Sequence, residues 1–417
     1  MRFLDGKMGR RYAKPLAYVV LTTAIAIGLL VVVVGPRGMG GGIDWFSRLA
    51  QNRAVQIGYF YKPPTDQSGA AGLANSQSII FLTQHDEKFR DQVRAAGFNG
   101  RIYQYLMANA IDGPAPPHMA PCDPNYVPWP NNAGDHVGDY CSLPEEAFLH
   151  NSKGERIYYT YHDYGPETWR TGTHYYTIMN PAHPAWRERW VRNMTEDVAT
   201  LGYDGLFLDD LDIVPYRIRN RLENSDGTIA EYPDDASYRE ALRGFLEHVR
   251  PHITKPMWAN MMGTVNDGSD WDMFMPYLDG GMNEAYALDW VPGYLKVKYW
   301  EGQQEQAEKV LQSGKGFLGV AQGRQDEVER MRFALSSFML IDQGDAVFRY
   351  SLGDGTSYRK LWDYPEFDVD LGEPLGPRYR DGETAWKRDF ACGHVRVDPA
   401  GPSYEFAPDE SLPTCQR

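Results

Sequence analysis

The stretch GYDGLFLDDLDI (residues 202–213) places an apolar run directly before a group of acids. Residues 206–208 are Leu, Phe and Leu, and Asp209, Asp210 and Asp212 follow almost at once. A short apolar run of this kind is typical of a parallel strand that is buried on both faces. Carboxylates at its end are costly unless they are solvated, paired or used. The strand therefore either ends in a solvated loop or delivers an acid to a working site.

Strand-like and helix-like runs alternate through residues 43–351, which predicts parallel βαβ units. Beside the strand within 202–213, we expect strands at 54–62, 78–84, 101–109, 174–180, 256–262, 273–287, 316–323 and 345–351. We expect helices at 85–98, 183–202, 235–250, 300–313 and 326–341, with Gly202 ending the second of these. About eight strands favour an α/β fold of the (β/α)8 TIM-barrel type over a doubly wound sheet. No glycine-rich phosphate loop follows the first strand, which disfavours a nucleotide-binding Rossmann domain.

Two segments are expected outside the regular barrel. Residues 110–170 form a long loop insert rich in Pro, Gly, Tyr and Trp, and loops of that length are usually functional. Residues 352–417 contain short extended runs between Pro and Gly residues, which predicts a small C-terminal β appendage. The expected domains are therefore a tail and anchor at 1–42, a catalytic barrel at 43–351 and an extension at 352–417.

The N-terminus has the pattern of a signal-anchor. Residues 15–35 carry no charge and are long enough to span a bilayer as a helix, and basic residues precede them. The positive-inside rule then keeps residues 1–14 in the cytoplasm and puts the body outside it. We expect a single-pass cell-membrane protein with an extracytoplasmic body, tethered through the glycine-rich residues 35–42. A cleaved signal peptide is the alternative, although no small-x-small cleavage site is evident.

The four cysteines all lie in the part expected to be exported. An even number of cysteines in an oxidising compartment predicts the disulfides Cys122–Cys141 and Cys392–Cys415, with free thiols as the alternative. Neither pair has the CxxC spacing of a zinc site.

Composition narrows the class of partner. The formal net charge of −14 argues against nucleic acid or an anionic membrane surface as the main partner. Aromatic residues make up 13% of the chain, which is compatible with the flat amphipathic rings of a carbohydrate-binding cleft.

Strand alternation selects the acid that can reach a central site. With Leu206 and Leu208 towards the helices, Phe207 faces the barrel interior and Asp209 stands at its mouth. Glu284 stands at the end of another expected strand. Two carboxylates from different strands that share one cleft are what glycosidic hydrolysis requires, since one protonates the leaving oxygen and the other attacks or activates water. A slip of one residue would put Asn283 in the place of Glu284.

Other polar and aromatic side chains at expected strand ends are candidate contacts for sugar hydroxyls and rings. The expected substrate-binding residues are Tyr59, Tyr61, Tyr105, Asn180, Asp210, Asn260, Tyr286 and Gln322. For each of them a structural role in the core or in a turn is the alternative. His162 and Asp163 in the insert could form a His–Asp dyad only with a nucleophilic Ser or Cys nearby, and the sequence has no G-x-S-x-G motif.

The stretch MNPAHPAWRERWVRNMTEDVATLGYDGLFLDDLD resembles the core of TIM-barrel families of hypothetical glycosyl hydrolases. Similar groups are the endo-α-1,4-polygalactosaminidases and the α-amylase-like barrels. The resemblance implies that Asp209 is a nucleophile or base, and it makes Glu284 the best match for the acid. The long insert and the C-terminal extension depart from the polygalactosaminidases, so the resemblance does not carry over a substrate.

The sequence thus predicts a membrane-anchored extracytoplasmic glycoside hydrolase that acts on cell-envelope or exopolysaccharide glycans without a cofactor or a bound metal. One alternative is a catalytically inactive barrel that binds glycan. Another is a metal-dependent deacetylase or hydrolase that uses Asp209, Asp210 and a histidine of the insert.

Overall fold

The computed structural model describes most of the body of the chain. The described residues are 55–113, 143–163, 172–211, 215–220, 222–261, 269–290, 293–353, 356–409 and 411. In this part of the chain, every helix is too short or too polar to cross a membrane. The expected membrane helix at 15–35 and the tether after it lie outside the described residues.

Eight parallel strands form the central sheet, in the order β1-β2-β3-β7-β8-β9-β10-β11. A parallel bridge between Ile57 and Phe348 joins the first strand to the last, so the sheet curls into a barrel as expected. The strands are β1 (Gly58–Tyr59), β2 (Ile79–Thr83), β3 (Arg101–Met107), β7 (Gly205–Asp209), β8 (Met257–Asn260), β9 (Gly280–Asn283), β10 (Gly316–Gln322) and β11 (Ala346–Ser351).

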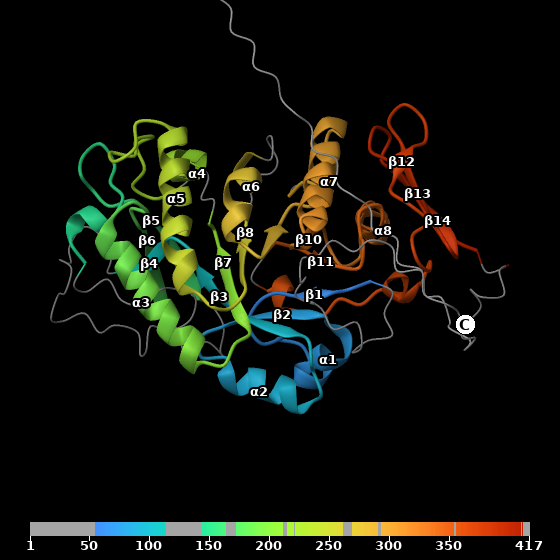
Figure 1. The fold of residues 1–417 in the computed structure, drawn as a ribbon, viewed down its shortest axis with the longest axis horizontal. Coiled ribbons are helices and arrows are strands. Elements are labelled where there is room, and N and C mark those ends of the chain that lie inside the picture. The colour runs from blue at the N-terminus through green and yellow to red at the C-terminus, as the bar shows by residue number, and fades with distance from the viewer. Residues whose placement is uncertain are drawn as a thin grey trace, which may run out of the picture. The chain divides into compact units, whose positions relative to one another are not determined.

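Helices connect these strands in chain order (Figure 1). They are α1 (Gly69–Ser76), α2 (Glu87–Ala95), α3 (Pro184–Thr200), α4 (Pro215–Asn220), α5 (Asp235–Val249), α6 (Ser269–Phe274), α7 (Val297–Gln312) and α8 (Val328–Met339). The helix α3 shows why these segments are helical and where they pack. Its residues Trp186, Trp190, Met194 and Val198 recur every fourth position and are buried on one face. Gly202 follows the helix with a φ of 75°, the left-handed conformation that was expected of it.

Aromatic side chains fill the barrel interior. The Phe207 ring lies 4.6 Å from that of Phe81, and Trp258 lies 5.9 Å from Tyr103. Gly280 and Gly316 make room for the Trp258 indole, because a Cβ at either position would stand 2.2 or 2.1 Å from a ring atom. The interior position expected for Phe207 is therefore confirmed, and Asp209 follows it on the same face of β7.

The segment between β3 and α3 contains a second sheet, where a loop had been expected. The strands β4 (Ala110–Gly113), β5 (Tyr158–Asp163) and β6 (Gly172–Ile178) pair antiparallel in the order β4-β6-β5. The expected strand at 174–180 thus belongs to this insert sheet and not to the barrel. Period-2 patterning does not reveal which sheet a strand will join, so the sequence could not separate the two.

Two further segments differ from or extend the expectation. The apolar run at 273–287 is a strand only in β9, because residues 269–277 form α6 and a 3-10 turn. After β11, the 3-10 turn Ser357–Arg359 returns to the barrel. An antiparallel sheet then follows, formed by β12 (Tyr379–Arg380), β13 (Trp386–Phe390), β14 (Gly393–Asp398) and β15 (Ser403–Pro408). The expected C-terminal β appendage is therefore present, and it packs on α8.

Candidate active site

Asp209 ends β7 at the mouth of the barrel and is half-buried there. Its Oδ1 accepts a hydrogen bond of 2.8 Å from the Asn260 side chain at the end of β8. Its Oδ2 accepts a hydrogen bond from the Tyr105 hydroxyl on β3. Donors from the two neighbouring strands therefore hold both carboxylate oxygens, which fixes the orientation of the group.

Glu284 directly follows β9 and is also half-buried. The Tyr358 hydroxyl donates a hydrogen bond of 2.6 Å to its Oε1, and Asn260 donates one of 2.8 Å to its Oε2. The side chain of Asn283 instead accepts a hydrogen bond from the Ala285 amide, at the turn after the strand. The structure thus has Glu284, and not its neighbour, facing Asp209.

Asn260 joins the two acids. Its Nδ2 donates to Asp209 Oδ1 and to Glu284 Oε2, each at 2.8 Å, so these two oxygens are at most twice that distance, 5.6 Å, apart. An amide nitrogen carries two hydrogens, so one side chain can serve both acceptors. The structure therefore brings the two predicted acids into one site.

Burial and mutual repulsion perturb both acids. Burial, followed by the nearby charge of Asp210, raises the pKa of Asp209 to about 6. Burial, followed by the charge of Asp209, raises the pKa of Glu284 to about 8. Near neutral pH, Asp209 is therefore mostly ionised while Glu284 holds its proton. Two carboxyl groups with separated pKa values can act as a base or nucleophile and an acid, respectively.

Three more of the expected residues surround this pair. The Tyr61 ring stacks on that of Tyr105 with centroids 4.7 Å apart. Gln322 ends β10, and its Nε2 donates to the Glu284 carbonyl at 2.5 Å and to the Tyr358 hydroxyl at 3.0 Å. Asp210 is buried beside Asp209 with a φ of 50°. The acids are thus held by tyrosines and amides from successive strands.

Two expected residues face away from the site. Tyr59 is buried in a cluster with Leu73 and Val93 of helices α1 and α2. Tyr286 is buried as well, and its hydroxyl bonds Gln304 and the Ser337 carbonyl. Both tyrosines belong to the packing between strands and helices, so the expectation of substrate contact is wrong for them. The sequence offered no way to see this, because a tyrosine suits both the core and a binding cleft.

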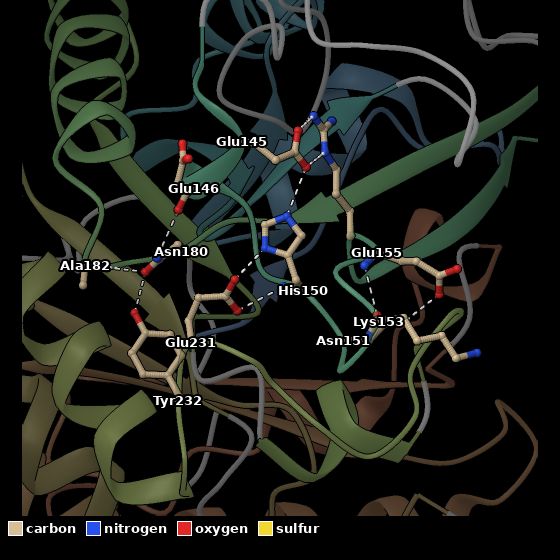
Figure 2. A network of polar contacts seen from close by, with 11 residues as sticks. Glu145, Glu146, His150, Asn151, Lys153, Glu155, Asn180, Ala182, Glu231 and Tyr232 are labelled. Carbon is tan, nitrogen blue, oxygen red and sulfur yellow. Dashed lines mark hydrogen bonds and ion pairs between the residues drawn. The ribbon is translucent and has the colours of Figure 1, made fainter.

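Asn180 serves a different network, which Figure 2 shows. Its Oδ1 accepts hydrogen bonds from the Ala182 amide and, at 2.5 Å, from the Tyr232 hydroxyl, and its Nδ2 donates to the Glu146 carbonyl. Asn180 thus ties the start of α3 to the insert and to the segment before α5. The bonds of Asn180 in the structure are structural, and its contact with substrate stays a prediction.

The same network is centred on His150, in the insert. Its Nδ1 lies 2.5 Å from Glu231 Oε1 and its Nε2 lies 3.0 Å from Glu145 Oε1 (Figure 2). Arg156 pairs with both oxygens of Glu145 at 2.7 and 2.5 Å. The two glutamates raise the pKa of the imidazole, hydrogen bonding to Glu231 most of all. The network links the insert to the segment 222–232, between α4 and α5.

Tyr358 is the residue of this site that the sequence did not point to. It lies in the 3-10 turn after β11, in the segment expected to begin a separate extension. Its position after a strand end, in the stretch SLGDGTSYRK, is the signal that could have drawn attention to it.

The metal and disulfide expectations concern residues that are described only in part. In the described ranges, no three His, Cys, Asp or Glu side chains are grouped so as to hold a metal ion. Cys392 is disulfide-bonded, whereas Cys122, Cys141 and Cys415 lie outside the described residues. The two pairings remain predictions.

Comparison with known proteins places the chain in a family. The sequence model of the family described as Hypothetical glycosyl hydrolase family 15 matches residues 128–394, a range that contains both acids, Asn260 and Tyr358. No curated protein matches the chain.

Solved structures are similar at low identity. The glycoside hydrolase domain of PelA from Pseudomonas aeruginosa is 14% identical with a TM-score of 0.44, and the match covers 74% of this chain and 97% of that one. An alpha-amylase from H. orenii is 12% identical with a TM-score of 0.41, over 83% of this chain and 89% of that one. An alpha-amylase from Malbranchea cinnamomea is 10% identical with a TM-score of 0.44, over 83% and 85%. All three TM-scores are below 0.5, so these likenesses do not bear on the reaction.

Proposed function

Because the chain belongs to hypothetical glycosyl hydrolase family 15, we propose that it is an active glycosidase that uses Asp209 as nucleophile and Glu284 as acid and base. The observation that carries this assignment is the shared donor, Asn260 Nδ2, which lies 2.8 Å from an oxygen of each acid. The raised pKa values, about 6 for Asp209 and about 8 for Glu284, support this division of roles. The group that is ionised near neutrality attacks, and the group that keeps its proton protonates the leaving group.

The reaction proceeds in two steps. The Glu284 carboxyl transfers its proton to the glycosidic oxygen as the bond from that oxygen to the anomeric carbon breaks. A carboxylate oxygen of Asp209 bonds to the same carbon and forms a glycosyl ester. Ionised Glu284 then takes a proton from water, whose oxygen attacks the anomeric carbon and releases Asp209. The two inversions leave the anomeric configuration unchanged.

The proposed retaining course requires the shorter of two possible spacings between the acids. Retaining enzymes have carboxyl groups about 5–5.5 Å apart, whereas inverting enzymes leave about 6.5–9.5 Å for a water molecule. The upper limit of 5.6 Å between Asp209 Oδ1 and Glu284 Oε2 is compatible with the shorter spacing, although it concerns one pair of oxygens and not the two carboxyl groups as wholes.

The proposed substrate class and location are supported by the sequence. The net charge of −14 favours neutral or amino-sugar glycans over polyanionic ones. The uncharged residues 15–35 would anchor the protein, with its body on the extracytoplasmic side, next to cell-envelope and exopolysaccharide glycans. Membrane fractionation of the full chain, with and without residues 1–42, tests the anchor. Recovery of both forms in the soluble fraction would contradict it.

The test of activity compares wild type with Asp209→Asn and Glu284→Gln on a panel of neutral and amino-sugar polysaccharides. Each near-isosteric change should lower the hydrolysis rate at least about a thousandfold, because it removes the nucleophile or the acid. Thermal melts establish that all three proteins fold. Proton NMR of the first product formed should show the anomer of the substrate.

Two outcomes would contradict parts of the proposal. Initial release of the opposite anomer would establish an inverting course and leave the acid pair in place. Glycan binding without hydrolysis by any of the three proteins would favour the catalytically inactive glycan-binding barrel.

A further inference from the structure

Trp290 is a large apolar side chain that the fold leaves open to solvent. It lies between β9 and α7, in the same connection as Glu284, and 40% of its surface is exposed. By contrast, the indoles of Trp258 and Trp300 in the core are fully buried. Its exposure sets Trp290 apart from these core indoles.

The Trp290 indole packs against the backbone of Gly353. Gly353, in the segment after β11, lies so close that a Cβ there would stand 2.2 Å from Trp290 Cζ3 and 2.9 Å from Gln322 Oε1. Gln322 Oε1 is buried without a hydrogen-bond partner. Trp290 therefore packs on a backbone position that only glycine leaves open, and it does so beside Gln322 at the end of β10.

Arg330 of α8 holds the loop that carries Trp290. Its Nη2 donates to the Asp289 carbonyl at 2.7 Å, and its Nη1 donates to the Gly293 carbonyl. Its Nε donates to the Gln322 carbonyl at 2.7 Å. One buried guanidinium thus fastens both sides of the Trp290 loop to the end of β10, so the indole is positioned before any ligand arrives.

Gln322 also connects this loop to the acid. Its Nε2 donates to the Glu284 carbonyl and to the Tyr358 hydroxyl, which in turn donates to Glu284 Oε1. Gln322 therefore lies beside Gly353, on which Trp290 packs, and also bonds the Glu284 backbone. A glycan whose glycosidic oxygen reaches Glu284 would lay a neighbouring sugar unit across this part of the surface.

We propose that Trp290 is a sugar-binding platform beside Glu284, on which the apolar C–H face of a sugar ring stacks. The inference rests on the proposed function and adds to it a binding residue on the side of the general acid. The ring supplies a flat apolar surface for the C–H face of the sugar. The platform suits a neutral or N-acetylated sugar, whose C–H face carries no charge to desolvate.

The test uses hexasaccharides of glucose, of N-acetylated amino sugar and of free amino sugar as probes. KM is measured for wild type, Trp290→Ala and Trp290→Phe, and Kd is measured calorimetrically for the same three in the Glu284→Gln background. Trp290→Ala should raise KM and Kd about tenfold, and Trp290→Phe should recover most of the loss because it keeps a flat ring. Tyr379→Ala is the matched control, since Tyr379 is 43% exposed but lies on β12 in the C-terminal sheet.

The outcomes separate this inference from the proposed function. Hydrolysis by wild type with unchanged KM and Kd in Trp290→Ala would overturn the platform and leave the glycosidase standing. Binding without hydrolysis, weakened by Trp290→Ala alone, would support the platform and overturn the glycosidase. Neither binding nor hydrolysis of any probe by wild type would overturn both.

Discussion

The Tyr358 hydroxyl donates a hydrogen bond of 2.6 Å to Glu284 Oε1, and this contact joins the segment after β11 to the end of β9. The same hydroxyl accepts a hydrogen bond from Gln322 Nε2, so its own proton is directed towards Glu284. A donor in this position stabilises the ionised carboxylate and lowers its pKa, in opposition to burial. Tyr358 is therefore a positioning residue that sets how far the pKa of the acid rises.

Tyr358→Phe should extend activity to higher pH. Loss of the donor raises the pKa of Glu284 further above about 8, so the acid keeps its proton in more alkaline buffer. The alkaline limb of the pH profile of kcat/KM should therefore move to higher pH. The value of kcat/KM at the optimum should fall by about tenfold or less. Tyr364→Phe is the control, because its hydroxyl bonds the Gln325 carbonyl. A lower rate with an unmoved alkaline limb would mean that Tyr358 acts only by packing.

Tyr105→Phe should act on the opposite limb. The Tyr105 hydroxyl bonds Asp209 Oδ2 and lowers the pKa of that acid, so its loss should raise the value above about 6. Asp209 must be ionised to attack, and the acidic limb of kcat/KM should therefore move to higher pH. Tyr203→Phe, whose hydroxyl bonds the Thr83 carbonyl at 2.7 Å, should leave both limbs in place. A shift of the alkaline limb instead would reverse the roles of the two acids.

Glu284→Gln should stabilise the protein increasingly as the pH rises. The folded pKa of Glu284, about 8, exceeds the value of about 4.3 expected for an unfolded chain. Between these values the folded state binds more protons than the unfolded state, so wild type loses stability as the pH rises. A neutral amide carries no such penalty, and Tm should exceed that of wild type by about 2 °C or more at pH 8. The gain should vanish near pH 4, and the exposed control Glu188→Gln should show no such trend.

The sequence predicted the parts of this molecule that depend on local pattern. Side chains alternate along a strand, and this pattern predicted the barrel strands. It also predicted that Phe207 faces the barrel interior and that Asp209 lies at the barrel mouth. The pairing of Asp209 with Glu284 needed only the rule that strand ends meet at one edge. Asn260 was expected to contact substrate, but its role between the acids depends on the order β7-β8-β9, which pattern does not supply. Tyr358 reaches Glu284 from the segment after β11, and contacts between residues so far apart in the chain leave no periodic signal.

Gly316→Ala and Gly302→Ala should change stability in opposite directions. A Cβ at Gly316 would stand 2.1 Å from the Trp258 ring inside the barrel, so the alanine should cost about 1–3 kcal/mol of unfolding free energy. Gly302 lies on the exposed side of α7 with no atom within 4 Å of such a Cβ. Alanine there should add about 0.5–1 kcal/mol through helix propensity. Denaturant titration of both variants measures the difference, and equal effects would contradict the packing of Trp258.

His150 should make the attachment of the insert depend on pH. When protonated, the imidazole donates to Glu231 and Glu145, and Arg156 keeps Glu145 ionised by holding its pKa at about 2. Because folding raises the pKa of His150, its stabilising contribution is complete below about pH 6.5 and is lost as the pH rises through the folded value. Hydrogen exchange in residues 143–163 and 222–232 should therefore speed up several-fold between pH 6 and 9, after correction for the intrinsic rate.

His150→Gln should exchange faster than wild type at pH 6. The difference should shrink as the pH rises to 9, because the imidazole of wild type then loses its proton and with it the charged contacts to the two glutamates. His248→Gln, on α5 and outside this network, should follow wild type at both values. An equal difference between His150→Gln and wild type at pH 6 and pH 9 would mean that the imidazole holds the insert as a neutral hydrogen-bonding group. Its protonation would then play no part in joining the insert to the segment before α5.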